Sequence, residues 1–297
     1  MDVLRTRDDL ARLDSLRGGR PLVLVPTMGA LHEGHLSLVR LAAEIGPVVV
    51  SIFVNPTQFG PDEDLDAYPR NLDADLDLLR PLSVAAVFAP DAGQMYGGPG
   101  EVTVEPGRRA AGLCGASRPG HFRGVLTVVA KLFGLVRPEV AVFGRKDAQQ
   151  CLVIDEMVRD LCFPVRLIDG ATVREPDGLA MSSRNRYLDD GDRRRALCLQ
   201  RALQKARGLI AAGERETGAL EAAMAEELAV ADGLDYAAVR SVPELETIER
   251  VEGRVLLAVA AQVGPARLID NLVLEVGDRG VMETGLLQSA AHPEGKE

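Results

Sequence analysis

Hydrophobic residues in the first 186 positions alternate between short continuous runs and longer stretches in which they recur every three or four residues. Continuous runs rich in Val and Ile are typical of buried strands, and the wider spacing is typical of one buried helix face. The expected strands cover 22–26, 47–54, 84–89, 139–143 and 165–168, and the expected helices cover 35–45, 69–80, 122–136 and 147–160. Strands that alternate with helices predict a Rossmann-like α/β domain, a parallel sheet with helices on both faces.

The pattern then changes and predicts a second, smaller α+β domain over residues 187–297. A charged helix is expected over 190–212, and another over 216–231. Three apolar runs separated by turn residues predict a small antiparallel sheet, at 234–239, 254–263 and 267–276. The polar tail from about residue 289 is expected to be disordered.

The composition is that of a large globular protein with an excess of negative charge. The chain has 297 residues, of which 46% are hydrophobic, and a formal net charge of −10. A chain of this length buries a sizeable core. Because binding to a phosphate backbone needs clustered Lys and Arg, a pI of about 5.1 argues against a nucleic-acid partner.

Cysteine usage and hydropathy favour a reducing cytoplasm. The four cysteines are scattered without a CxxC pair, so neither a metal knuckle nor a disulfide framework is expected. The first residues lack the apolar stretch of a secretion signal, and no run approaches the ~18 apolar residues of a membrane span. We therefore expect a cytoplasmic protein without a membrane partner.

The segment PTMGALHEGH at 26–35 joins the first expected strand to a helix. Gly29 and Gly34 remove side chains where backbone must approach a ligand, and a helix N-terminus presents unpaired N–H groups with partial positive charge. His32 and His35 lie three residues apart and can donate hydrogen bonds to phosphate oxygens. The pattern predicts a polyphosphate site; helix capping by one histidine and packing by the other is the structural alternative.

A zinc site at these histidines is disfavoured by their spacing. The metalloprotease helix needs two residues between Glu and the second His, and only Gly34 separates Glu33 from His35. His121 could supply a third ligand, but no cysteine lies near either position. The acidic residues Asp62, Glu63, Asp64 and Asp66 are interpreted as a solvated helix start. We expect no metal centre held by protein ligands alone.

Polar residues also follow two other expected strands, and ligands of parallel sheets bind beyond the carboxyl ends of the strands. Gln58 carries both donors and an acceptor, so it can hold a hydroxyl and a carboxylate of a small substrate. Gly144 permits close approach, Lys146 supplies a point charge for phosphate, and Asp147 can bind ribose hydroxyls or a magnesium-bound water. A structural role is the alternative for an isolated loop glutamine.

Three more segments carry candidate chemistry. RPGHFRG at 118–124 is a glycine-rich helix entry that supplies substrate contacts or forms a surface turn. Gln149 and Gln150 begin the next helix, and one of them could face the cleft. MSSR at 181–184 provides two hydroxyls and a guanidinium suited to a triphosphate. With the histidine segment it predicts two sides of an ATP site in an enzyme that activates a carboxylate.

Together these segments resemble the pantothenate synthetase (pantoate–β-alanine ligase) family. The shared motifs are PTMGALHEGH at 26–35, FVNPTQF at 53–59, YPR at 68–70, GHFRG at 120–124, KD at 146–147, QQ at 149–150 and GLAMSSRN at 178–185. The histidine and MSSR segments are also similar to the HIGH and KMSKS elements of the wider nucleotidyltransferase superfamily. Arg145 and Ala148 depart from the family pattern, in which Glu and Tyr are common.

The resemblance implies ATP-dependent condensation of (R)-pantoate with β-alanine, giving pantothenate, AMP and diphosphate through a pantoyl-adenylate, with Mg²⁺ accompanying ATP. It implies catalytic roles for His32, His35, Lys146, Ser182, Ser183 and Arg184, with His35 as proton donor. The implied ATP site comprises Met28, Gly29, Ala30, Leu31, His32, Glu33, Gly34, His35, Gly144, Arg145, Lys146, Asp147, Val173, Met181, Ser182, Ser183 and Arg184. Gln58 would hold pantoate and β-alanine, and Gln150 pantoate. A homodimer and a C-terminal lid domain are also implied.

Two other functions stay open. A nucleotidyltransferase of the same superfamily that acts on a different small acceptor would keep both motifs, but should need further basic residues for an acceptor phosphate. A noncatalytic nucleotide sensor would bind ATP without releasing diphosphate. Analysis of the reaction products separates all three.

Overall fold

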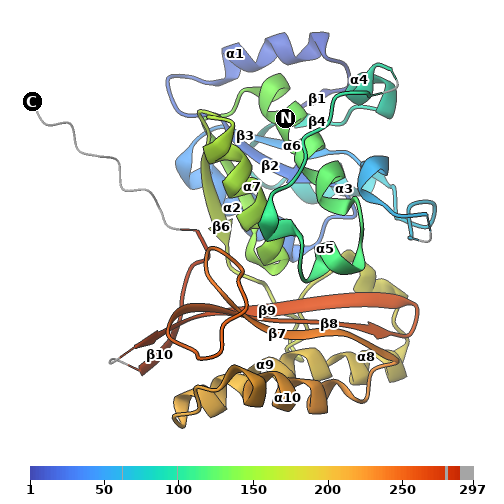
Figure 1. Cartoon of the computed structure of the whole chain (residues 1–297). Helices are drawn as coiled ribbons and strands as arrows, with labels where there is room; N and C mark the ends of the chain where they lie inside the picture. The colour runs from blue at the N-terminus through green and yellow to red at the C-terminus, as the bar shows by residue number, and fades with distance from the viewer. Residues whose placement is uncertain (62, 99, 278–279, 288–297) are drawn as a thin grey trace, which may run out of the picture.

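The computed structural model describes residues 1–61, 63–98, 100–277 and 280–287, which form two domains stacked on one another (Figure 1). The N-terminal domain contains a parallel six-stranded sheet in the order β1-β4-β3-β2-β5-β6. Its strands are β1 (Asp2–Leu4), β2 (Val23–Thr27), β3 (Val48–Ile52), β4 (Val84–Phe88), β5 (Val140–Gly144) and β6 (Arg166–Gly170). The predicted Rossmann-like sheet is confirmed, and β1 is an additional edge strand.

Helices cover both faces of this sheet. Alternate strand residues point to opposite faces, and the apolar side chains on each face pack in a separate cluster with helices. Leu24, Val49 and Ala141 pack in one cluster with α6 and α7, whereas Val25 and Val50 pack in the other with α2 and α3. The helices are α1 (Leu13–Leu16), α2 (Glu33–Ile45), α3 (Leu72–Leu79), α4 (Ala92–Tyr96), α5 (Cys114–Ser117), α6 (His121–Val136) and α7 (Ala148–Asp160). Short 3-10 turns are η1 (Asp8–Arg12), η2 (Pro56–Gln58), η3 (Arg108–Ala110), η4 (Arg145–Asp147) and η5 (Ser183–Tyr187).

The C-terminal domain is an antiparallel sheet in the order β10-β9-β8-β7 with helices on one side. Its elements are α8 (Asp190–Ala196), α9 (Cys198–Ala211), α10 (Thr217–Leu228), β7 (Gly233–Ser241), β8 (Gly253–Val263), β9 (Ala266–Gly277) and β10 (Gly280–Glu283). In Figure 1 this sheet lies between the N-terminal domain and α9 and α10. Leu256 and Val273 accordingly pack in the first N-terminal cluster, and Leu257 and Leu272 pack in the cluster that contains α9.

Two expectations for this region were wrong in detail. The single helix predicted over 190–212 is divided into α8 and α9 at Leu197, where ψ of −12° interrupts the α-helical hydrogen-bond ladder. The α8 sequence is polar except for Ala196, which is its only buried residue, so no apolar period marks where one helix ends and the next begins. The three predicted strands are joined by a fourth, β10, whose short and mostly exposed sequence carries no alternating pattern.

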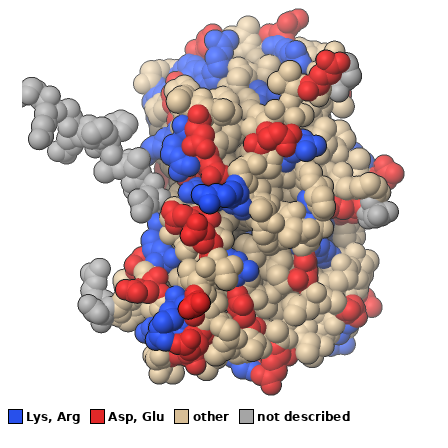
Figure 2. All heavy atoms as spheres, viewed as in Figure 1, with Lys and Arg blue, Asp and Glu red and all other residues tan. Residues whose placement is uncertain are grey.

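On the face that Figure 2 shows, Lys and Arg side chains are interspersed with Asp and Glu side chains over both domains. No helix within the described ranges is long and apolar enough to cross a membrane. Asp62 and the tail from residue 289, for which expectations are stated above, lie outside the described residues.

Candidate active site

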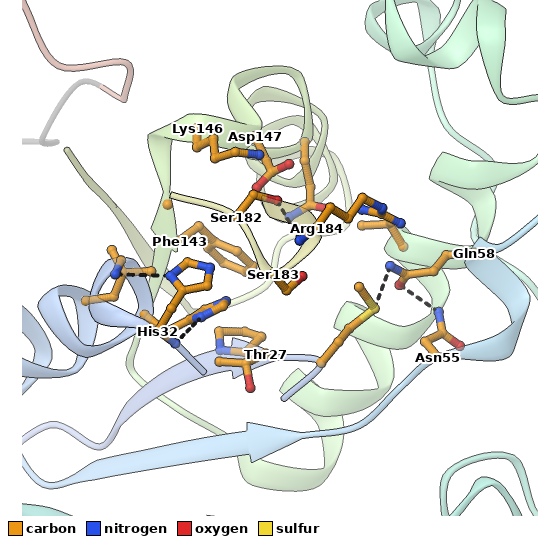
Figure 3. Close-up of a pocket in the computed structure, with 18 of the residues that line it drawn as sticks. Thr27, His32, Asn55, Gln58, Phe143, Lys146, Asp147, Ser182, Ser183 and Arg184 are labelled. Carbon is orange, nitrogen blue, oxygen red and sulfur yellow. Dashed lines mark hydrogen bonds between the residues drawn. The ribbon is translucent and has the colours of Figure 1, made fainter. Parts of the chain in front are cut away.

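A cavity of about 230 Å³ opens beyond the carboxyl ends of β2, β3 and β5, where a parallel sheet is expected to bind its ligands (Figure 3). Most of the predicted residues line it: Met28, His32, Gly34, His35, Gln58, Gly144, Lys146, Asp147, Gln150, Val173, Met181, Ser182, Ser183 and Arg184. The predicted Gly29, Ala30, Leu31, Glu33 and Arg145 are not part of this lining. The structure therefore brings segments separated by more than a hundred residues to one place.

The rings of His32 and His35 both accept hydrogen bonds from backbone N–H groups at the N-terminus of helix α2. His32 is the N-cap, and its Nδ1 accepts a hydrogen bond from the Gly34 N–H at 3.2 Å. The His35 Nδ1 accepts one from the His32 N–H at 3.4 Å. A ring nitrogen that accepts carries no proton, so in both neutral rings Nε2 must carry it. The capping alternative and the phosphate-donor prediction are thus compatible, because capping uses one nitrogen and leaves an Nε2–H donor.

The pKa values of both rings show that they are neutral at pH 7. Burial, followed by the charges of Lys146 and Arg186, lowers the pKa of His32 to about 4. Burial, followed by His32 and Lys146, lowers the pKa of His35 to about 3. Lys146 therefore lies near enough to repel a proton from either ring, as expected of groups that face one anion together.

Asp75, which no sequence motif indicated, accepts hydrogen bonds from the backbone of the turn before these histidines. The Asp75 carboxylate is buried in α3 and accepts hydrogen bonds from the Ala30 N–H at 3.0 Å and the Leu31 N–H at 2.8 Å. Gly29 and Ala30 both have positive φ, 78° and 50°. A Cβ on Gly29 would lie 2.8 Å from the Asp75 Oδ2. These residues shape the turn, whereas Glu33 forms an ion pair with Arg40.

The opposite side of the cavity is supplied by β5 and η4. Lys146 and Asp147 line the cavity, and Figure 3 shows them across from His32. The Arg145 side chain instead donates to the Asp169 carboxylate at 2.6 Å, outside the lining. Gln150 lines the cavity, whereas the buried Gln149 donates to the carbonyls of Arg109 and Gly112. Of the two glutamines, Gln150 is therefore the one that faces the cleft.

The MSSR segment closes a third side. Ser182 caps η5 by accepting from the Arg184 N–H, and it lines the cavity with Ser183. Arg184 donates to both carboxylate oxygens of Asp64, at 3.0 and 2.7 Å. Asp64 thus orients a guanidinium, a role that an acidic run alone does not reveal.

The far end of the cavity combines one amide with apolar walls. The Gln58 Oε1 accepts from the Asn55 Nδ2 at 3.0 Å, and its Nε2 donates to the Met28 sulfur at 3.1 Å (Figure 3). A Cβ on Gly124 would lie 2.3 Å from the Thr57 carbonyl oxygen, so α6 contacts this loop backbone to backbone. The apolar lining here includes Phe53, Val125, Val128 and Val129.

Arg118 and His121 join the glutamine loop to the entry of α6. The His121 Nδ1 pairs with the Gln58 carbonyl at 2.8 Å and must donate, so its Nε2 accepts from Arg118 at 3.0 Å. Arg118 also forms a bidentate ion pair with Glu63, at 2.6 and 2.5 Å. Both side chains line the cavity, which favours substrate contacts over a surface turn for this segment.

Comparison with known proteins agrees with this geometry. The family model of pantoate-beta-alanine ligase matches residues 2–273. Pantothenate synthetase of Moorella thermoacetica is 54% identical over 263 residues, which are 88% of this chain and 93% of that protein. The crystal structure of pantothenate synthetase from Thermus thermophilus has a TM-score of 0.86 at 43% identity, covering 92% of this chain and 99% of that one.

A second solved structure is pantoate-beta-alanine ligase from Francisella tularensis, complexed with beta-gamma ATP and beta-alanine. Its TM-score is 0.74 at 33% identity, covering 92% of this chain and 97% of that one. Fold and cavity define an α/β enzyme with an added antiparallel domain. Because the family model matches almost the whole length of the chain, the chain belongs to the pantoate–β-alanine ligase family. The reaction of this family joins pantoate to β-alanine and gives pantothenate. The resemblance predicted from the motifs is confirmed.

Proposed function

We propose that this cavity binds ATP between the histidine turn and the Lys146 and MSSR segments, and that it activates pantoate as a pantoyl-adenylate. The observation that carries the proposal is the convergence of two Nε2–H donors, an ammonium and a guanidinium on one cavity. The Francisella relative, solved with beta-gamma ATP and beta-alanine, supports it.

In the first step, a pantoate carboxylate oxygen attacks the α-phosphorus of ATP. The bond from that phosphorus to the oxygen bridging the β-phosphorus breaks, and diphosphate leaves with the electron pair. Such a step needs positioning and charge neutralisation more than a protein nucleophile. His32, His35, Lys146, Ser182, Ser183 and Arg184 supply the donors and positive charge.

Before ATP binds, burial holds the pKa of His35 at about 3, so the ring is a neutral donor at pH 7. Negative charge that develops beside the ring favours its protonated form and raises that pKa. The ring therefore donates a hydrogen bond through Nε2 and gains basicity as phosphate charge lies beside it. This qualifies the role of proton donor inferred for His35 from the family resemblance.

In the second step, the β-alanine amine attacks the carbonyl carbon of the adenylate, the bond from that carbon to the AMP oxygen breaks, and the amine loses a proton. Gln58 and Gln150 would orient pantoate, and Gln58 would also contact β-alanine. The apolar walls beside Gln58 suit the two methyl groups of pantoate. A further cavity between the domains, lined by Gln150 and by Tyr236, supports the C-terminal domain as the lid that limits hydrolysis.

Mg²⁺ would enter with ATP. Among the described residues, no three His, Cys, Asp or Glu side chains come together as a metal site. Mg²⁺ keeps several waters and binds through substrate phosphates with one or two carboxylates, so Asp147 at the cavity fits such a site. The bound ion would neutralise phosphate charge.

The test supplies Mg-ATP and (R)-pantoate, with and without β-alanine, and measures diphosphate, AMP and pantothenate. We expect adenylate and diphosphate without β-alanine, and AMP and pantothenate when it is added. Diphosphate release only with a different acceptor would assign the chain to the nucleotidyltransferase alternative, and no release with any acceptor would assign it to the sensor.

We also infer a cytoplasmic homodimer. The four scattered cysteines, without a CxxC pair, support the compartment, and the family resemblance supports the dimer. Light scattering of the purified protein tests the dimer directly.

A further inference from the structure

Strand β9 of the C-terminal domain contacts both the turn that carries Lys146 and the segment that leads into MSSR, through two consecutive residues. Asp270 and Asn271 are buried polar side chains, exposed by only 3% and 5%. Consecutive strand residues point to opposite faces of a sheet. Each of these side chains therefore meets a different part of the chain.

Asn271 contacts the turn that carries Lys146. Its side-chain Nδ2 donates to the Lys146 carbonyl at 2.8 Å and to the Arg145 carbonyl at 3.1 Å. An amide nitrogen has two N–H groups, so both are used. The Asn271 Oδ1 is buried and has no partner among the described residues. This side chain thus serves as a double donor to one short turn.

The turn has few local hydrogen bonds that could replace this contact. Asp147, the residue before α7, forms no side-chain cap, and Gly144, the residue before η4, has no side chain that could form one. The Arg145 side chain points away from the cavity to the buried side chain of Asp169, which itself accepts from the Leu286 and Leu287 N–H groups. The orientation of Lys146 therefore depends on contacts made outside the cavity.

Asp270 holds the other segment. Arg174 donates to both of its carboxylate oxygens, at 2.6 and 3.0 Å, and also to the Gly178 carbonyl at 3.1 Å. Leu179 packs in the C-terminal core, so the chain between Val173 and Met181 passes over the helix-covered face of this sheet. The MSSR segment, residues 181–184, begins where this part of the chain ends.

We propose that Asn271 is a positioning residue for the ligase reaction, which fixes the η4 turn so that Lys146 faces the ATP phosphates. The inference rests on the proposed phosphate role of Lys146. In this arrangement the C-terminal domain contributes to adenylation through a strand, in addition to covering the cavity. Because the contact is to backbone carbonyls, it acts on where the lysine lies and leaves its charge unchanged.

The experiment compares Asn271→Ala and Asn271→Asp in the full-length enzyme. Aspartate keeps the shape but cannot donate to two carbonyls. We expect both variants to lower kcat/KM for ATP by roughly tenfold to a hundredfold, with the KM for pantoate changed by less than about threefold. Val255→Ala, a buried change in the neighbouring β8 away from the turn, is the matched control for loss of packing.

A double-mutant cycle with Lys146→Ala distinguishes positioning from general destabilisation. If Asn271 acts through Lys146, Asn271→Ala should add less than about a twofold loss in the Lys146→Ala background. Three results would overturn the inference alone. These are wild-type kinetics in both Asn271 variants, equal increases in the KM for ATP and the KM for pantoate, and full additivity of the Asn271→Ala and Lys146→Ala effects. Normal ATP kinetics in Lys146→Ala would overturn the proposed phosphate role and the inference with it.

Discussion

Asp75 should be essential to the histidine turn although it does not line the cavity. Its carboxylate accepts hydrogen bonds from two consecutive backbone N–H groups, those of Ala30 and Leu31. Ala30 has φ of 50°, a left-handed conformation that costs a non-glycine residue on the order of 1 kcal/mol. We therefore expect Asp75→Asn to relax the turn and to displace both His32 and His35.

The size of the effect follows from these two bonds. Asparagine keeps one neutral acceptor and directs an amide N–H toward the other backbone N–H. Losing a charge-assisted bond and leaving a buried N–H unpaired costs about 2–4 kcal/mol. Burial raises the pKa of Asp75, so the ionised carboxylate is itself destabilised, and a neutral amide avoids that cost. The net loss of stability should be about 1–3 kcal/mol.

Activity should fall further than stability alone requires, because a displacement of about 1 Å at a reacting centre can cost roughly a hundredfold in rate. Thermal unfolding measures the stability, and single-turnover diphosphate release from Mg-ATP and pantoate measures adenylation. Asp73→Asn, on an exposed position of the same helix, is the control and should change both little. Wild-type stability together with a wild-type rate in Asp75→Asn would refute the assignment.

Three further variants test the cavity itself. His35→Ala should remove most adenylation while the fold stays intact, because an Nε2–H donor to the leaving diphosphate is lost; diphosphate release and circular dichroism measure the two. Gln58→Ala should weaken pantoate binding more than ATP binding, since the amide lies at the apolar end; titration calorimetry with each ligand measures this. His121→Asn should reduce the acid sensitivity of folding. Burial and then Arg118 lower the pKa of His121 to about 4, so the unfolded chain takes up a proton near pH 6.5 and the fold does not. The contribution of His121 to stability is complete above pH 6.5 and falls by about 1–2 kcal/mol between pH 6.5 and 5, in addition to the losses expected from His32 and His35; urea unfolding at several pH values measures it.

Each of these has an outcome that contradicts it. Near-normal diphosphate release by His35→Ala would refute the role of that ring. Equal losses for both ligands would count against the contact of Gln58 with pantoate. An acid slope equally steep in the wild type and in His121→Asn would refute the contribution of His121, because His32 and His35 titrate over that range in both proteins.

The sequence predicted most of the fold because its strands and helices carry strong periods. The buried strands β2, β3 and β5 are mainly apolar runs, α2 buries one clear stripe, and α6 is apolar and buried along most of its length. The expectations failed where the pattern is short or absent. Four-residue β10 shows no alternation, and α8 buries only Ala196, so no apolar period marks the division at Leu197.

The sequence by itself determined the motifs and hence the family, because the groups proposed to touch ATP and pantoate lie in contiguous segments whose chemistry can be read residue by residue. Only the tertiary structure decided which groups hold those segments in place. Asp75 acts on the turn 45 residues before it, Asp64 on Arg184 at a separation of 120, and Asn271 on Lys146 at a separation of 125. Such contacts leave no local pattern, since any buried carboxylate or amide needs a partner and the fold alone brings that partner within hydrogen-bonding distance.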